Sequence, residues 1–352
     1  MKIQKCFLYT NSGVRSQWRH QVLSRYTHLR RYKSGSTLQY KPLDVLDNAN
    51  IATFRQRYFI TERPILLPRQ SFRDLPAYER WFHHPQTGPN VAKLNTGYLA
   101  QHGAEAIVPL ELTQPQTSDP TDSEQESNSF RQFHAPLDLF LQWITAAESQ
   151  SAPQPQSTRL YLAQCQLLDL PQILRDDFPT PTIVAQAGKG DVYDTNVWIG
   201  YPPTYTPLHR DPNPNLFVQL AGRKVVRLLA PQDGQKVFSL VRGHLGRSGG
   251  RDAAVFRGDE MMQGRERVLL EQAVWDNTDT NTTTIEGTVC EGFEAEVEAG
   301  DGLFIPKGWW HSIKGTGEGV TASVSLIYLF GCSCVFANFL GQLVVSLAEL
   351  FY

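Results

Sequence analysis

Short apolar runs, separated by Gly, Pro and Asn, recur through the second half of the chain and predict a series of β-strands. They cover residues 182–187, 195–199, 216–229, 294–297, 302–305, 309–313 and 320–329. About eight short strands of this kind are typical of a double-sheet jelly roll. We therefore expect a mainly β fold, a double-stranded β-helix with flanking helices on its N-terminal and C-terminal sides.

The first half of the chain carries the longer apolar spacing that is typical of helices. Leu137, Phe140, Leu141 and Ile144 recur at intervals of three and four residues and predict one helix. Helices are also expected over about residues 48–59 and 75–82, and a short strand over 64–67. We expect these elements to flank the jelly roll within one domain that covers residues 42–330.

Three polar stretches interrupt that domain, at residues 113–129, 148–158 and 243–281. Their composition lacks the apolar side chains that a packed core needs, and we expect solvated insertions. Residues 1–41 contain nine Lys or Arg and no acidic residue. That composition is typical of an amphipathic mitochondrial transit peptide, with a disordered basic tail as the alternative.

The C-terminal stretch, residues 331–352, is apolar and has Glu349 as its single charge. Its length would permit a membrane span. Its content of Gly, Ser, Asn and Gln instead favours a helix that packs on the jelly roll or on a partner subunit, as in a homodimer.

Charge and cysteine content narrow the classes of partner and compartment. The formal net charge of −2 gives no electrostatic reason to expect a nucleic-acid partner. The five cysteines are odd in number and have neither the spacing of a disulfide framework nor that of a zinc ribbon. A reducing compartment fits these cysteines. Together with the basic N-terminal segment, this leads us to expect the mitochondrial matrix, with the nucleus or cytoplasm as alternatives.

The chemistry centres on His209 and Asp211, which lie two residues apart and therefore share one face of a strand. His311 stands at the end of a second apolar strand. Two histidines and one carboxylate on one face of a metal, with open positions opposite, form the arrangement of non-haem Fe(II) oxygenases. Lys224 lies in an otherwise apolar strand, where its charge would be costly without an anionic partner.

Three motifs carry a family resemblance. They read N-x-W-x-G from Asn196, T-P-L-H-x-D-P-x-x-N-x-x-V-Q-x-x-G-R-K from Thr206, and F-I-P-K-G-W-W-H from Phe304. The chain resembles JmjC-domain 2-oxoglutarate oxygenases of the cupin superfamily, closest to the small JmjC protein hydroxylases of the arginyl-hydroxylase branch. The resemblance spans about residues 42–329. It implies hydroxylation of a side chain of a protein or peptide substrate, with release of succinate and CO2.

The resemblance also implies roles for individual residues. His209, Asp211 and His311 would hold Fe(II), leaving positions for 2-oxoglutarate and O2, and Lys224 would bind the distal carboxylate of 2-oxoglutarate. Further residues implied around the cosubstrate are Tyr161, Thr206, Asn215, Trp198 and Ser325. Taken alone, the prolines around Thr206 and Asn215 would favour simple turn chemistry.

Glu111 matches an acidic residue of the arginyl-hydroxylase branch and is the predicted substrate-binding residue, because an arginine substrate needs a carboxylate partner. The alternative is a carboxylate on the solvent face of a strand.

Other functions remain open at this point. The chain could be a JmjC histone lysine demethylase, but it lacks a Cys/His zinc cluster of the kind found in chromatin-reading modules, which favours a hydroxylase. It could be a non-catalytic cupin binding module, although all three ligand positions are present. It could also be a metal-dependent isomerase or dioxygenase of the wider cupin group. Those sites usually carry an additional histidine close to the first, where this chain has Arg210.

Overall fold

The computed structural model describes residues 38–85, 91–115, 128–149, 158–188, 192–250, 261–276 and 290–328. All of them belong to the larger of two units into which the chain divides, Leu38–Asn277 with Cys290–Tyr352. The predicted N-terminal segment lies outside the described residues up to position 37, and residues 331–352 lie wholly outside them. The expectations of a transit peptide, a C-terminal helix and a partner subunit therefore stay predictions. No helix in the described ranges combines the length and the apolar character needed to cross a membrane.

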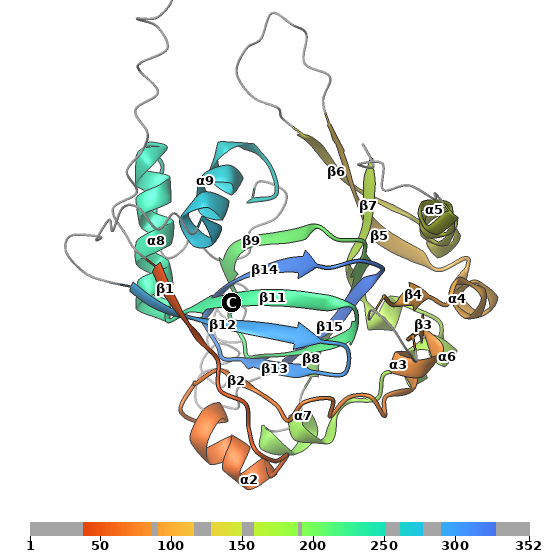
Figure 1. Cartoon of the computed structure of the whole chain (residues 1–352), viewed down its shortest axis with the longest axis horizontal. Helices are drawn as coiled ribbons and strands as arrows, with labels where there is room; N and C mark the ends of the chain where they lie inside the picture. Colours follow the sequence, from red (N-terminus) through yellow and green to blue (C-terminus); the bar gives the residue numbers. More distant parts are fainter. Residues whose placement is uncertain are drawn as a thin grey trace, which may run out of the picture. The chain divides into compact units, whose positions relative to one another are not determined.

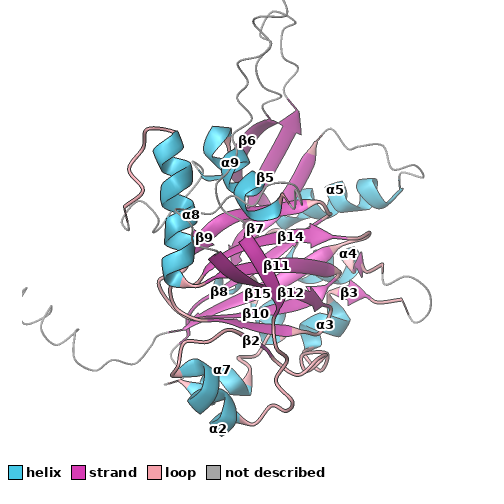
Figure 2. Ribbon diagram, turned by 60° about the vertical axis from the view of Figure 1, so that its left-hand side comes forward, coloured by secondary structure: helices cyan, strands magenta, loops and turns pink. Residues whose placement is uncertain are grey.

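Two mainly antiparallel sheets form the centre of this unit, with helices placed around them (Figures 1 and 2). The five-stranded sheet has the order β1 (Leu38–Pro42), β12 (Cys290–Glu298), β11 (Arg223–Leu229), β14 (Trp310–Thr316), β9 (Thr204–Arg210). The eight-stranded sheet has the order β2 (Ile65–Leu66), β13 (Gly302–Ile305), β10 (Asn215–Ala221), β15 (Thr321–Tyr328), β8 (Val192–Gly200), β7 (Arg159–Gln166), β5 (Ile107–Pro115), β6 (Asn128–Pro136). A separate hairpin pairs β3 (Phe82–His83) with β4 (Lys93–Leu94). The jelly-roll prediction is confirmed.

One apolar cluster combines residues of both sheets. It consists of Leu43, Leu66, Phe217, Val226, Leu228, Ala295, Val297, Leu303 and Ile305. On β11 the members are Val226 and Leu228, which alternate with outward-facing residues, and Lys224 continues the same inward-facing row. The inward-facing row of β11 is therefore apolar except for Lys224.

A larger cluster packs helices against the eight-stranded sheet and includes Phe140, Leu141 and Ile144. The helices are α2 (Ile51–Phe54), continued by a π-helical turn η2 (Arg55–Phe59), α3 (Pro76–Arg80), α4 (Thr96–Gly103), α5 (Leu137–Ser149), the 3₁₀ turn η3 (Leu167–Asp169), α6 (Gln172–Asp176), α7 (Thr182–Ala187), α8 (Pro231–His244) and α9 (Gly264–Trp275). The spacing that predicted α5 is confirmed, because its apolar residues are the buried ones.

Several element boundaries differ from the sequence prediction. Residues 182–187 were expected as a strand and form helix α7, because Ile183, Val184 and Ala187 bury one helical face and Pro181 precedes the first turn. The stretch 243–281, expected as a solvated insertion, contains the end of α8 and all of α9. Residues 38–41, expected in the N-terminal segment, pair in β1 with β12.

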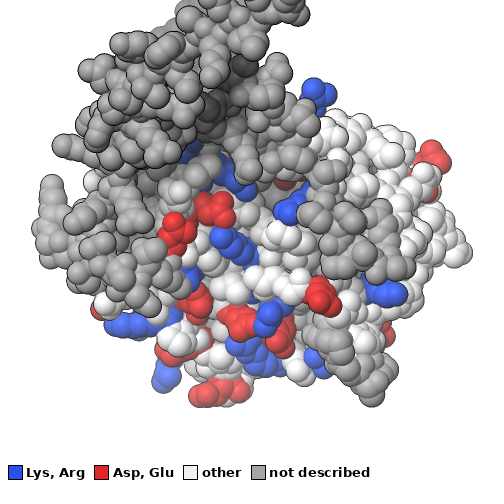
Figure 3. Space-filling view, turned by 45° about the horizontal axis from the view of Figure 1, so that its top comes forward, with Lys and Arg blue, Asp and Glu red and all other residues white. Residues whose placement is uncertain are grey.

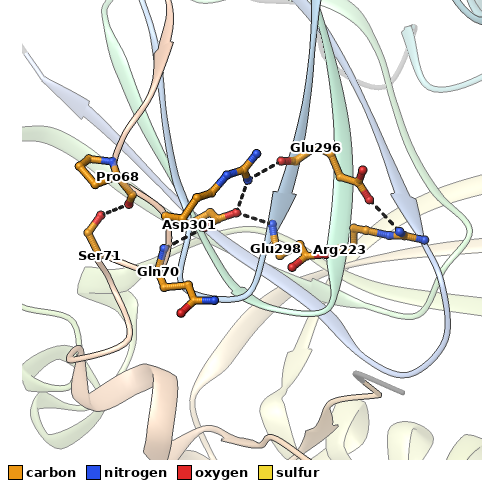
Figure 4. A network of polar contacts seen from close by, with 8 residues as sticks. Pro68, Gln70, Ser71, Arg223, Glu296, Glu298 and Asp301 are labelled. Atoms are coloured by element: carbon orange, nitrogen blue, oxygen red, sulfur yellow. Dashed lines mark hydrogen bonds and ion pairs between the residues drawn. The ribbon is translucent and has the colours of Figure 1, made fainter. Parts of the chain in front are cut away.

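The turn between β12 and β13 is fastened by the carboxylate of Asp301, which is 2% exposed (Figure 4). It accepts hydrogen bonds from the backbone N–H of Gln70 at 2.9 Å and of Glu298 at 3.0 Å, and pairs with Arg69. These contacts connect the segment that follows β2 to the turn that precedes β13. Figure 3 shows acidic and basic side chains interspersed among the described residues on one face of the molecule.

Candidate metal centre

Strands β9 and β14 bring the two predicted histidine ligands together. His209 and His311 lie directly opposite in the antiparallel register, with ring centroids 4.1 Å apart. Asp211 follows β9, and its carbonyl oxygen accepts a hydrogen bond of 3.0 Å from the N–H of Gly308 just before β14. One ligand atom from each of the three residues lies within 4.8 Å of the others. In the described part of the chain this is the one such group of three.

Backbone carbonyls hold both imidazole rings in the orientation that a metal ligand needs. Nδ1 of His209 donates to the carbonyl oxygen of Pro207 at 2.8 Å, and Nδ1 of His311 donates to that of Trp309 at 3.2 Å. With Nδ1 protonated, Nε2 of each ring carries the free lone pair. Burial, followed by the neighbouring His209, lowers the pKa of His311 to about 4, so this ring is neutral at neutral pH.

The donor set fits a divalent metal. Two neutral imidazoles and a carboxylate suit Fe(II) and leave coordination positions open on one side. Nδ2 of Asn215 donates to Oδ2 of Asp211 at 3.3 Å and thus orients the carboxylate. Oδ1 of Asn215 is buried without a hydrogen-bond partner among the described residues, which is typical of an atom that meets a ligand or water.

Lys224 is a buried amine on the inner face of β11, the strand next to β14, and is 3% exposed. Its Nζ donates to Oγ of Ser323 at 2.7 Å and to the hydroxyl of Tyr161 at 3.4 Å, and it lies 5.4 Å from the ring of Phe217. None of the described carboxylates forms an ion pair with Lys224. Burial lowers the pKa of Lys224 to about 7, because the charged amine loses its contact with water. An anion bound next to the amine would compensate for that loss and favour the charged form.

The inner face of β8 links the lysine to the metal centre. The ring of Trp198 lies 6.3 Å from that of Tyr161, which contacts Lys224, so Trp198 faces inward. By strand alternation Asn196 and Asp194 face the same way, and Nδ2 of Asn196 donates to Oδ2 of Asp194 at 2.8 Å. Ser325 lies opposite Asn196 on β15. The structure thus brings the predicted cosubstrate residues Tyr161, Trp198, Asn215, Lys224 and Ser325 to one interior region.

Thr206 joins the same interior through its register. It lies opposite Ile313, whose side chain packs against the cluster between the sheets. Its position is compatible with a hydroxyl group that faces the cosubstrate. The roles of all these residues stay predictions.

Glu111 lies on β5 directly opposite Tyr161 on β7, and therefore on the same face as Tyr161. Nε2 of Gln132 donates to Oε1 of Glu111 at 3.0 Å, which orients the carboxylate. Burial, and then the charge of Glu111, raises the pKa of Tyr161 well above its usual value. Glu111 thus lies on the same strand face as Tyr161 and influences its ionisation, and its role in substrate binding stays a prediction.

Comparison with known protein families identifies the family of this chain. A model of the cupin-like domain family matches residues 51–330, most of the chain. The chain belongs to the cupin-like domain family.

Similar curated proteins include the "Lysine-specific demethylase JMJ30" of Arabidopsis thaliana, 25% identical over 79% of this chain and 53% of the relative. The "Jumonji C domain-containing protein 5" of Drosophila melanogaster is 25% identical over 76% of this chain and 56% of that protein. The "Lysine-specific demethylase 8" of Danio rerio is 40% identical over 22% of this chain and 20% of that protein. The chain thus spans about half the length of the first two relatives. They place it among cupin-like JmjC domains and leave its branch within them unassigned.

Sequence reasoning assigned no role to three polar residues in the interior of this cupin-like domain, although Asn196 opens one of its motifs. Asp194 and Asn196 share a strand face with Trp198, and Ser323 shares one with Ser325. Alternation by two residues from each predicted position would have found them. Asn196 is 3% exposed and its Oδ1, like that of Asn215, has no hydrogen-bond partner among the described residues.

Proposed function

We propose that this cupin-like domain is an Fe(II)- and 2-oxoglutarate-dependent dioxygenase that hydroxylates a protein side chain and releases succinate and CO2. The observation that carries the proposal is the pairing of a His-Asp-His group with a buried lysine that has no recorded carboxylate partner among the described residues. A metal-binding module alone needs only the first of these features. A dicarboxylic cosubstrate that reaches from the metal to a second anchor explains both.

The residues of this chain would bind and orient the reactants. Lys224, with Ser323 and Tyr161, would hold the distal carboxylate through charge-assisted hydrogen bonds. Phe217 and Trp198 border that region with apolar surface, which limits water and strengthens the electrostatic attraction. Bound Fe(II) would supply the oxygen chemistry, which lies beyond the capacity of the protein's own side chains.

Two carboxylates support a cationic substrate side chain. Glu111 faces the interior from β5, and Asp194 faces it from β8, where Asn196 orients it. A guanidinium can donate two parallel hydrogen bonds to a carboxylate, so an arginine side chain is the substrate that we propose. A JmjC lysine demethylase is the second candidate, because several relatives carry that name.

The product distinguishes the two candidates. The protein is incubated with Fe(II), 2-oxoglutarate, O2 and a proteome extract, and the peptides are analysed by mass spectrometry. A hydroxylase leaves one added oxygen on a peptide, whereas a demethylase removes a methyl group and releases formaldehyde. Succinate release with peptide oxidation supports the proposal. No substrate-stimulated succinate, in a protein that binds metal, would favour the binding-module alternative.

A further inference from the structure

The strand that carries His209 contains an irregularity that sets the direction of this ligand. Between the pairs His311–His209 and Ile313–Thr206, β14 contributes one residue, Ser312, while β9 contributes two, Pro207 and Leu208. This is a β-bulge, with one extra residue in β9. Bulges commonly occur next to active sites, where they redirect a side chain.

The bulge is necessary for the site because strand alternation would otherwise separate its residues. Tyr205 lies opposite Lys314 and faces outward, with the guanidinium of Arg267 from α9 4.9 Å from its ring. Strict alternation from Tyr205 would place His209, four residues on, on the same outward face. The extra residue changes the phase, so that both Thr206 and His209 face inward.

The bulge also presents the carbonyl group that orients His209. Pro207 has no N–H for the ladder, and proline is tolerated at such positions for that reason. Its carbonyl oxygen accepts the 2.8 Å hydrogen bond from Nδ1 of His209. A rotation of the peptide bond plane between Pro207 and Leu208 would therefore move the acceptor that orients the His209 ring.

Two successive side-chain hydrogen bonds connect helix α9 to this irregular segment. Oγ of Ser312, a fully buried residue, donates to the carbonyl oxygen of Thr206 at 2.8 Å. Nε1 of Trp275, the last residue of α9, donates to the same Oγ at 2.9 Å. The charged groups of Arg227 and Lys314 lie 4.6 and 4.9 Å from the Trp275 ring and help to hold it on the outer face of the sheet.

We propose that Trp275, acting through Ser312, is a positioning residue for the metal ligand His209. Neither side chain touches the metal centre. Together they fix the carbonyl of Thr206, and hence the bulge that aims the Pro207 carbonyl at the His209 ring. The inference rests on the proposed metal site but not on the identity of the substrate. Helix α9 thereby contributes to metal binding from the opposite face of the five-stranded sheet.

The test uses the full chain and measures Co(II) binding by competition with a coloured chelator, together with thermal unfolding of the metal-free protein. Ser312→Ala removes both hydrogen bonds, while Trp275→Phe removes one donor and keeps an aromatic ring against Arg227 and Lys314. Ser239→Ala on helix α8 is the matched control. It also removes two side-chain hydrogen bonds, one donated to the carbonyl oxygen of Gly249 at 2.9 Å and one accepted from Nε2 of Gln235 at 3.1 Å, away from β9 and Trp275.

We expect Ser312→Ala and Trp275→Phe each to weaken Co(II) binding by about tenfold, the lower end of the range for groups that orient metal ligands. The double variant should bind Co(II) no more weakly than Ser312→Ala alone, since both act through one path. Ser239→Ala should bind as the wild type does. Equal Co(II) affinity in Trp275→Phe and wild type would overturn the inference, whatever happens to stability. A wild-type protein that binds no Co(II) would instead contradict the proposed metal site itself.

Discussion

Nε2 of His311 lies 3.8 Å from Oδ2 of Asp211, although the two residues belong to different strand ends. The carboxylate is oriented from one side by Asn215, and the ring by the carbonyl of Trp309. A buried neutral imidazole beside a carboxylate in this geometry offers two ligand atoms to one ion. The first prediction follows from this pair.

Replacing Asp211 by alanine should lower the affinity for Fe(II) or Co(II) by more than about a hundredfold, because it removes the one anionic ligand of the group. Metal content is measured after dialysis against a limiting metal concentration, and folding is checked by circular dichroism. Asp233→Asn on helix α8, where the carboxylate pairs with Lys236, is the control for loss of one negative charge. Retention of metal by the Asp211 variant would remove this residue from the ligand set.

Lys224→Met should strongly weaken 2-oxoglutarate binding and stabilise the ligand-free protein. Methionine has a similar length and carries no charge to desolvate, whereas burial lowers the pKa of Lys224 from its ordinary value of 10.5 to about 7. We expect a rise of roughly 2–4 °C in Tm for each kcal/mol gained, as is typical of a domain of this size. Calorimetric titration with 2-oxoglutarate and a thermal melt measure both effects. Unchanged cosubstrate affinity would show that the lysine has another role.

The same lysine predicts a pH dependence. Because the pKa of Lys224 is about 7 in the folded protein and 10.5 ordinarily, the unfolded chain binds more protons between these values. The stability of the ligand-free protein should therefore rise with pH across that window, and the burial penalty is fully present below pH 7. A carboxylate ligand favours the charged lysine, so 2-oxoglutarate affinity should fall by up to about tenfold per unit above pH 7.

Titrations in two buffers of different ionisation enthalpy give the number of protons taken up on binding. We expect nearly one proton per 2-oxoglutarate at pH 8.5 and little uptake at pH 6. Lys224→Met should lose this difference. An affinity independent of pH between 7 and 9 would contradict the assignment of a neutral lysine in the empty site.

Glu111→Gln should raise the KM for an arginine-containing substrate by about tenfold and leave cosubstrate binding nearly unchanged, since it removes a charge-assisted hydrogen bond to the substrate alone. Steady-state succinate release measures this effect. Glu105→Gln, an exposed residue before β5, makes the same chemical change away from the interior. Equal effects of the two substitutions would assign Glu111 to the general surface charge.

The metal ligands and Lys224 could be predicted from the sequence because each is a polar residue in or next to a mainly apolar strand. A lysine in an apolar strand and a carboxylate two residues from a histidine are visible without knowing the fold. The positions of most strands in the second half of the chain could likewise be predicted from apolar runs. The expectation that His209 and Asp211 share a strand face assumed that the strand covers both residues, but β9 ends at Arg210 and Asp211 belongs to the segment that follows it.

Other features depend on contacts between distant segments. Residues 182–187 contain β-branched side chains and were predicted as a strand, but packing of Ile183 and Val184 selected a helix. The contact between Ser312 and Trp275 joins two elements separated by a long polar stretch, and nothing in either local sequence indicates it. The same holds for Asp194, whose importance arises from the inward row that Trp198 begins.

The most direct measurement is the visible spectrum of the anaerobic protein after addition of Fe(II) and then 2-oxoglutarate. If the dicarboxylate binds to the metal through its 2-oxo acid group and to Lys224 through its far end, a weak charge-transfer band should appear on the second addition. The band should be absent from Asp211→Ala and require far more 2-oxoglutarate in Lys224→Met. A wild-type sample that binds Fe(II) but stays colourless, and forms no succinate when O2 is admitted, would contradict the account.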